Sequence, residues 1–243
     1  MLVMLAVCQT SSEDIMKRTT PEKSLHHALP SVLLTGFDAF GGDAVNPSWL
    51  AVQALHDVVI DGHRVVAAQL PTTFAGSGRE LLKLLRMHQP VLVVCVGLAS
   101  GRSALSLERV AINIDDARIA DNSGAQPVDV PVVKGGPPAY FSTLPIKAML
   151  QSLTDAGVAA EVSQTAGTFV CNHVFYVLMH ALKKQHLLSS VYNVRGGFVH
   201  VPYLPGQGVP SMSLEETVRG LQLAVSCALV TEQDALVGAG ALS

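Results

Sequence analysis

From residue 31 onward, apolar positions along the chain follow two patterns in turn. Short continuous runs of Val, Ile, Leu and Phe are separated by longer segments in which apolar residues recur every three or four positions. The first pattern is typical of strands buried on both faces, and the second is typical of amphipathic helices. The predicted strands are 31–37, 64–71, 90–97, 159–164 and 195–203. The predicted helices are 46–55, 78–89, 145–157, 169–185 and 213–230.

These strands and helices alternate along the chain. That order predicts an α/β fold, namely a single-domain three-layer α/β/α sandwich around a mostly parallel, mixed central sheet. Two helix starts carry capping signals, because Asn46 precedes Pro47, and Ser213 is followed by Glu216. Residues 107–124 are polar and lack a helical period, so we expect a hairpin or a long loop that projects from the sheet.

The first 30 residues have a different character. A short apolar start is followed by Ser, Thr, Glu, Lys and Pro without periodicity, and no basic residue precedes the apolar part as it would in a secretory signal. We therefore predict a poorly ordered leader at 1–30 and one domain at 31–243. No window approaches about 20 uninterrupted apolar residues, which predicts that no helix crosses a membrane.

Composition and charge narrow the possible partners. With 243 residues, 49% of them hydrophobic, the chain can bury a substantial single core. Its 16 Lys and Arg residues are scattered among 19 Asp and Glu residues, which argues against a nucleic-acid or anionic-membrane partner and favours small or peptide-like ones. The four cysteines lie far apart without a C-x-x-C motif. We therefore expect no metal site, no dense disulfide framework, and a reducing, cytoplasmic location.

The first predicted strand ends in the glycine-containing loop "GFDAFGG". This loop matches neither the dinucleotide motif nor the P-loop motif, so it does not predict a phosphate site. Phe37 and Phe40 stand in it instead. At the carboxyl end of a strand they would either line a cavity for a small flat apolar group or pack against the core beneath the loop. The pattern alone favours packing against the core.

Cys171 stands apart from the other cysteines. Cys95 and Cys227 lie inside apolar runs, as inert core cysteines do. Cys171 follows the break "TAG" and falls in the first turn of a predicted helix, where unpaired backbone N–H groups favour the reactive thiolate. It is the candidate nucleophile.

A thiol nucleophile in acyl transfer needs a base within hydrogen-bond reach and a third group that orients this base. His173 lies two residues further on, a rotation of about 200° on a helix, and so points to the opposite side. His180 lies about 13 Å along the axis from Cys171 and is again on the far side. His200 is at the end of a predicted core strand, which makes it the candidate base.

Five segments carry a resemblance to a known family. They are "LLTGFDAFGG…NPSW", "CVGLASGRSALSLERVAINIDDARIADNSG", "GGPPAYFSTLPIKAM", "TAGTFVCNH" and "RGGFVHVPYLP". In this order they resemble the successive motifs of the pyroglutamyl peptidase I family of cysteine peptidases, over about Ser31 to Val230. The resemblance implies that Cys171 is the nucleophile, His200 the base and Glu108 the carboxylate that orients the imidazole. It implies no metal and no organic cofactor, and it makes His173 a bystander.

The family binds the lactam ring of an N-terminal pyroglutamyl residue between aromatic side chains. The matching pocket positions are Phe37, Phe40, Asn46, Phe169 and Val170. The substrates implied by the resemblance are peptides that begin with pyroglutamate, and the family's frequent homotetramers imply an oligomer.

Two further roles rest on the resemblance alone. Arg118 is implied to help hold the developing oxyanion beside the backbone N–H of Cys171. Without the resemblance, Glu108 next to Arg109 would be interpreted as half of a surface ion pair of little energetic value.

The chain departs from the family pattern at three positions. Leu98 replaces the usual Gln, Ser100 replaces a Gly, and Ala39 replaces a Pro. Two alternatives therefore stay open. One is a related cysteine amidohydrolase with shifted specificity, and the other is a weakly active homologue that binds pyroglutamyl peptides without turning them over.

Overall fold

The computed structural model of the protein describes residues 29–188 and 194–240. All but the last two residues of the leader predicted at 1–30 lie outside this part. None of the helices in it combines the length and the apolar character that a membrane span requires.

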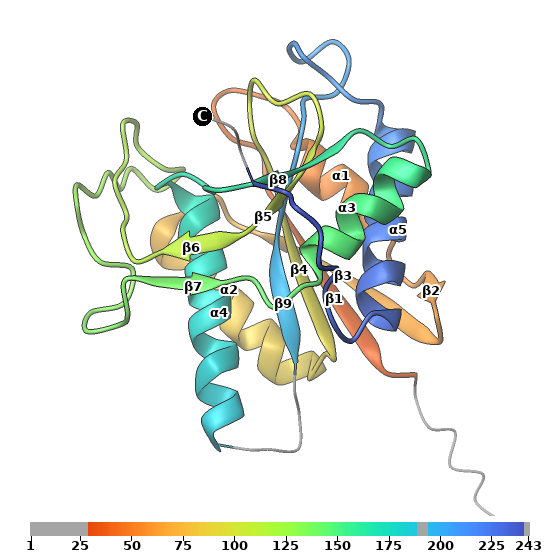
Figure 1. The fold of residues 1–243 in the computed structure, drawn as a ribbon. Coiled ribbons are helices and arrows are strands. Elements are labelled where there is room, and N and C mark those ends of the chain that lie inside the picture. The colour runs from red at the N-terminus through yellow and green to blue at the C-terminus, as the bar shows by residue number, and fades with distance from the viewer. Residues whose placement is uncertain (1–28, 189–193, 241–243) are drawn as a thin grey trace, which may run out of the picture.

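The centre of the molecule is a seven-stranded sheet in the order β2-β3-β1-β4-β9-β5-β8 (Figure 1). Four neighbouring pairs run parallel: β1 with β3, β1 with β4, β4 with β9, and β5 with β8. The β2–β3 and β5–β9 pairs are antiparallel, so the predicted mostly parallel, mixed sheet is confirmed. The strands are β1 (Ser31–Phe37), β2 (Val59–Ile60), β3 (His63–Leu70), β4 (Leu92–Leu98), β5 (Leu105–Glu108), β8 (Ala160–Ser163) and β9 (Arg195–Val201).

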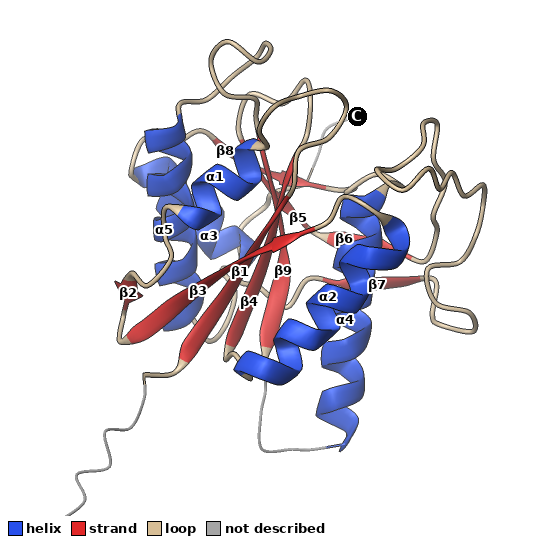
Figure 2. Cartoon of the chain, turned by 180° about the vertical axis from the view of Figure 1, so that it is seen from behind, coloured by secondary structure: helices blue, strands red, loops and turns tan. Residues whose placement is uncertain are grey.

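Helices cover both faces of this sheet and complete the three predicted layers (Figures 1 and 2). Each face has its own buried apolar cluster, one beneath α1, α3 and α5 and the other beneath α2 and α4. Apolar residues on both sides explain why the central strands show unbroken hydrophobic runs. The helices are α1 (Pro47–Gln53), α2 (Phe74–His88), α3 (Ile146–Asp155), α4 (Val170–Leu188) and α5 (Leu214–Val230).

A second, two-stranded sheet lies beside α4. It pairs β6 (Val110–Ile112) with β7 (Ala139–Phe141), and the chain between the two strands forms a long excursion. The buried side chain of Asn172 accepts a hydrogen bond from the backbone N–H of Ile112 and donates to the carbonyls of Ile112 and Ile114. This amide fastens the hairpin to the first turn of α4.

The predicted loop at 107–124 is therefore partly wrong, because its first residues belong to the central strand β5. This strand is hard to recognise in the sequence because Ser106 and Glu108 are polar and yet fully buried. Both are satisfied by distant partners, since Ser106 donates to Glu161 and Glu108 binds His200. A polar strand of this kind depends on tertiary contacts that local pattern does not contain.

Helix α2 begins at Phe74, four residues before the predicted start. Thr73 caps it by accepting from the N–H of Gly76, and Asp121 accepts from the N–H of Phe74. The sequence pattern placed the start too late because Gly76 and Gly78 lie in the first turns, and glycine disfavours helix interiors. The caps predicted at Asn46 and Ser213 are confirmed, with each side chain accepting a backbone N–H.

Candidate active site

Cys171 is the second residue of α4 and therefore lies in its first turn, as the pattern predicted. The turn that precedes it depends on Gly167, whose φ of +78° lies in the left-handed region. Cys171 as a whole residue is partly exposed, whereas Cys95 is fully buried in the core. Cys227, which we predicted to be a core residue, is only partly buried on α5.

The thiol of Cys171 lies against the sheet at the position of His200. Gly97 of β4 pairs in register with His200 of β9, and a Cβ atom at Gly97 would lie 2.9 Å from Cys171 Sγ. The absence of a side chain at Gly97 therefore lets the thiol approach the strand pair that carries the imidazole. In the described structure the imidazole binds Glu108, and no hydrogen bond joins it to the thiol.

His200 and Glu108 form a buried pair. His200 Nδ1 lies 2.7 Å from Glu108 Oε1, and the two residues are 3% and 0% exposed. The antiparallel β5–β9 register places Ser106 opposite His200, so Glu108 at the end of β5 reaches the ring. A carboxylate at Nδ1 accepts its proton and leaves Nε2 as the free acceptor.

Glu108 also receives a hydrogen bond from a cation. Arg102 Nη1 donates to the same Oε1 at 2.7 Å, and Arg102 Nη2 donates to the carbonyl of Thr165. Arg109 bonds elsewhere, to Gln164 and to the carbonyl of Ala239. The surface ion pair with Arg109 that the sequence alone would indicate is therefore not formed.

Burial sets the protonation of the thiol and the imidazole. It raises the pKa of the Cys171 thiol to about 12, the charge of Glu108 adds to this rise, and Arg102 opposes it. Burial also lowers the pKa of His200, against the hydrogen bond and the charge of Glu108. Near pH 7 both groups are neutral. Desolvation thus opposes the stabilisation of the thiolate that the helix N-terminus offers.

A cavity of about 380 Å³ opens beside Cys171. The five pocket residues implied by the resemblance all line it, and so does Cys171 itself. The full lining is Phe37, Phe40, Gly41, Asp43, Val45, Asn46, Thr72, Leu98, Ser100, Ile119, Phe169, Val170, Cys171 and Tyr203.

Aromatic side chains form one wall of this cavity. The rings of Phe40 and Phe169 have centroids 5.3 Å apart, tilted at 48°. Phe74 of α2 packs edge-on behind Phe169 at 5.2 Å, and His173 packs edge-on against Phe74. Phe37 is almost completely buried at the end of β1. The loop phenylalanines therefore both pack and line a cavity, so the two interpretations left open by the pattern coexist.

Asn46 shapes the same loop from the start of α1. Its Oδ1 accepts from the N–H of Ser48, and its Nδ2 donates to the carbonyl of Asp38. The helix cap and the loop of the cavity are thus held by one buried side chain.

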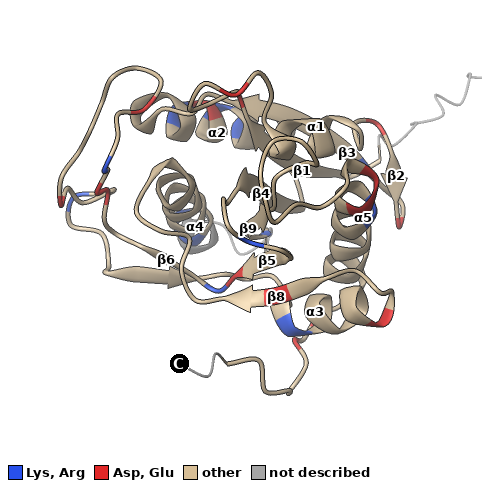
Figure 3. Cartoon of the chain, turned by 90° about the horizontal axis from the view of Figure 1, so that it is seen from above, with Lys and Arg blue, Asp and Glu red and all other residues tan. Residues whose placement is uncertain are grey.

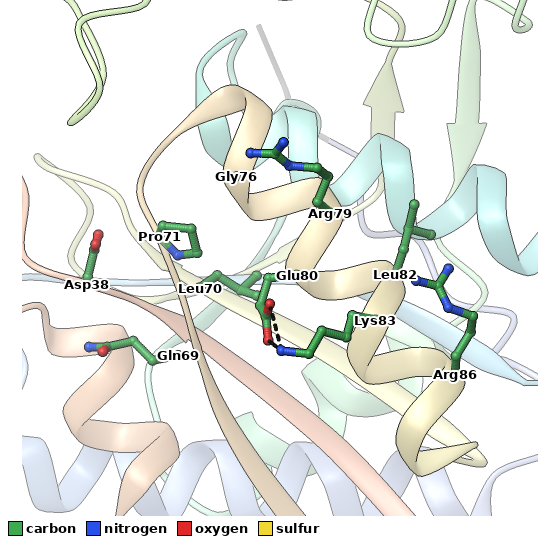
Figure 4. Close-up of a pocket in the computed structure, with 10 residues that line it drawn as sticks. All are labelled: Asp38, Gln69, Leu70, Pro71, Gly76, Arg79, Glu80, Leu82, Lys83 and Arg86. Carbon is green, nitrogen blue, oxygen red and sulfur yellow. Dashed lines mark hydrogen bonds and ion pairs between the residues drawn. The ribbon is translucent and has the colours of Figure 1, made fainter.

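A larger cavity lies elsewhere, between α2 and the end of β3 (Figure 4). Its lining includes the exposed side chains Arg79 and Lys83, and Lys83 pairs with Glu80. None of its lining residues is a Cys, Ser, Thr or His, so it offers no thiol or hydroxyl nucleophile and no imidazole base. More widely, acidic and basic residues are interspersed on α2 and over the loops (Figure 3).

Comparison with known proteins decides the family. A profile of the pyroglutamyl peptidase family matches residues 30–231. Pyrrolidone-carboxylate peptidase 1 of Ralstonia nicotianae is 52% identical over 219 residues, which are 88% of this chain and 100% of that protein. The chain belongs to the pyroglutamyl peptidase family.

Solved structures of this family agree with the sequence match. The crystal structure of pyroglutamyl peptidase I from Bacillus amyloliquefaciens superposes with a TM-score of 0.82 and 44% identity, covering 87% of this chain and 100% of that one. The pyrrolidone carboxyl peptidase from Thermococcus litoralis gives 0.81 and 35% identity, covering 86% and 100%.

Two departures of this family member from the expected pattern lie at the cavity itself. Leu98 ends β4 and Ser100 follows in the next loop, and both line the cavity. The carbonyl of Ala39 accepts from Asn122 Nδ2, which ties the first loop to the excursion between β6 and β7.

Arg118 is exposed and is not among the residues that line this cavity, whereas its neighbour Ile119 is. Its implied role at the oxyanion stays a prediction. His173 points to the far side, as its rotation on the helix predicted, and its Nδ1 lies 2.8 Å from Asp115 Oδ2.

Sequence reasoning missed several residues of the cavity, among them Val45, Thr72, Ile119 and Tyr203. Thr72 and Tyr203 follow the carboxyl ends of β3 and β9, where ligands gather in open α/β sheets, so that rule would have found them. Ile119 lies in the excursion between β6 and β7, and the sequence contains no signal that places it at the cavity.

Proposed function

We propose that this protein is a cysteine exopeptidase that removes an N-terminal pyroglutamyl residue from peptides through a Cys171–His200–Glu108 triad and an acyl-enzyme. The observation that carries the proposal is the buried 2.7 Å contact between His200 and Glu108, with His200 paired in register to Gly97 of β4, against which the Cys171 thiol lies. Membership of the pyroglutamyl peptidase family supports the same substrate class.

The resting thiol is neutral, so the base must take its proton during attack. In this mechanism the substrate draws Cys171 Sγ and His200 Nε2 to hydrogen-bond distance. Sγ forms a bond to the pyroglutamyl carbonyl carbon while its proton moves to Nε2. Glu108 stabilises the imidazolium through Nδ1–H. Unpaired N–H groups in the first turn of α4 supply donors for the oxyanion.

Collapse of the tetrahedral intermediate breaks the carbon–nitrogen bond. His200 returns its proton to the leaving amine, which departs as the shortened peptide, and the pyroglutamyl group remains as a thioester on Cys171. A water molecule then attacks the thioester while His200 accepts its proton. The products are free pyroglutamate and the regenerated thiol.

The character of the cavity supports a lactam substrate. Aromatic and aliphatic residues line most of it, and Asp43 is its charged lining residue. A lactam ring carries no charge, so an apolar cavity receives it without desolvating an ammonium group. A prolyl residue has the same ring size but a charged nitrogen and no ring carbonyl.

The decisive assay compares pyroglutamyl and prolyl arylamides as fluorogenic substrates. We expect a kcat/KM for the pyroglutamyl amide at least about 10³-fold higher, because the prolyl ammonium must be desolvated without any carbonyl contact. Comparable values would refute the proposal and favour a general cysteine amidohydrolase. Binding of the pyroglutamyl amide without a burst of released amine would favour the binding homologue.

A homotetramer and a cytoplasmic location stay predictions from the family resemblance. Sedimentation velocity on the purified chain and fractionation of cells would check them.

A further inference from the structure

We propose that Arg102 is a positioning residue of this active site, which holds Glu108 in place for His200 and fastens the loop that leads to Cys171. The inference rests on the proposed function. The resemblance assigned no role to Arg102.

Glu108 needs this cation more than a surface carboxylate would. Its side chain is completely buried, and Oε1 accepts from both Arg102 and His200. Its second oxygen, Oε2, is buried without a hydrogen-bond partner among the described residues. Burying a charge is costly unless an opposite charge and hydrogen bonds compensate its desolvation. Without Arg102, the imidazole of His200 would be the only remaining partner of this carboxylate among the described residues.

The second hydrogen bond of Arg102 reaches the nucleophile's side of the site. Arg102 Nη2 donates to the carbonyl of Thr165 at 3.0 Å, two residues before Gly167, where the chain turns into α4. A planar guanidinium holds two acceptors in a fixed geometry, whereas a lysine ammonium is a point charge on a flexible stem. Arg102 thus connects the end of β5 to the entrance of the helix that carries Cys171.

The charge of Arg102 acts on both reacting groups. The groups that face the thiol are Glu108 from β5, Cys95 from β4 and Arg102 from the β4–β5 loop, and Arg102 is the one that lowers its pKa. Glu108 and Arg102 also face His200. Loss of this positive charge would therefore raise the pKa of the Cys171 thiol and reduce the fraction of thiolate at any pH below it.

The test compares Arg102→Gln, Arg102→Lys and the control Arg109→Gln. Arg109 adjoins Glu108 and has the same charge, but its bonds go to Gln164 and Ala239, so its loss controls for charge alone. Two quantities are measured: the rate of Cys171 alkylation by iodoacetamide between pH 7 and 9, located by mass spectrometry, and the steady-state kinetics with a pyroglutamyl arylamide.

We expect Arg102→Gln to slow alkylation about tenfold or more, because one pKa unit is a factor of ten in thiolate. Its kcat should fall by about 10- to 100-fold, with KM within about threefold of wild type. Arg102→Lys keeps the charge and should alkylate at the wild-type rate, with a smaller loss of kcat. Arg109→Gln should match wild type in both measurements. In a further variant, Arg102→Ala, added guanidinium at millimolar concentration should restore part of kcat.

A purely structural Arg102 would give another pattern. Equal losses in the Gln and Lys variants, with unchanged alkylation and a raised KM, would overturn the inference. If Arg102→Gln does not fold, the Lys variant decides: wild-type alkylation with reduced kcat supports the inference, and wild-type kcat contradicts it. If the wild type does not cleave the pyroglutamyl amide, the proposed function fails, while the alkylation rates still test Arg102.

Discussion

Gly97→Ala is the substitution that tests the geometry of the site most directly. A Cβ atom at this position would lie 2.9 Å from Cys171 Sγ and 2.8 Å from Cζ of Phe198. Non-bonded heavy atoms are most stable at about 3.5–4.0 Å, so the thiol must retreat by roughly 0.6–1.1 Å or the ring must move. A misplacement of about 1 Å at a reacting group can cost about 10²-fold in rate.

The matched control is Gly196→Ala in β9. A Cβ atom there would lie 2.8 Å from Leu182 Cδ1 and 3.2 Å from Leu178 Cδ2, which are core side chains. Both substitutions should therefore destabilise the fold by about 1–3 kcal/mol through overpacking. For a chain of this size that corresponds to about 2–4 °C in Tm for each kcal/mol.

The two variants should separate in kinetics. With a pyroglutamyl arylamide, and with active protein corrected for the folded fraction, we expect Gly97→Ala to lose about 10²-fold in kcat and Gly196→Ala to stay within about threefold. Equal losses of kcat in the two variants would show that both losses come from destabilisation of the fold and not from the position of the thiol. A wild-type kcat in folded Gly97→Ala would refute the placement of the thiol against β4.

Three other substitutions test the assigned roles. Cys171→Ser should abolish turnover with an unchanged circular dichroism spectrum, because an alcohol lacks the acidity of a thiol; survival of activity that Cys95→Ser then removes would identify a different nucleophile. His200→Ala should lower kcat by about 10²–10⁴-fold, whereas His173→Ala, which loses its contact with Asp115, should change mainly the Tm; the reverse ranking in steady-state kinetics would contradict the helix geometry. Phe169→Ala should raise KM because the lost ring contact weakens substrate binding by roughly 1–3 kcal/mol, while kcat changes less. An unchanged KM would show that Phe169 is not part of the substrate pocket.

The layers of the fold were predictable from sequence because buried strands and amphipathic helices leave strong periodic patterns. Strand β5 was not, since the burial of Ser106 and Glu108 is compensated by partners 55 and 92 residues away. No local window contains that information.

Some residues of the site were predictable from the sequence pattern, and others only from the family resemblance. The rotation between Cys171 and His173 on the helix excluded His173 as the base, and the place of His200 at the end of a core strand made it the candidate. Glu108 came only from the family resemblance, because its acidic side chain looks like a surface residue without its partners. The effect of burial on the pKa of the thiol was not predictable for a related reason, since burial depends on tertiary packing that a helix position does not reveal.

The position of β5 in the sheet has a consequence for how activity appears as the protein is made. This strand comes from the middle of the chain but lies between β9 and β8, which are both synthesised later. Glu108 can pair with His200 only after β9 has been made, and their separation of 92 positions makes the pairing a non-local folding step. A nascent chain still lacking β9 contains Cys171 but not His200, so under the proposed mechanism we expect it to be inactive. During refolding, the return of turnover should likewise follow the recovery of helix, because only the complete sheet assembles the triad.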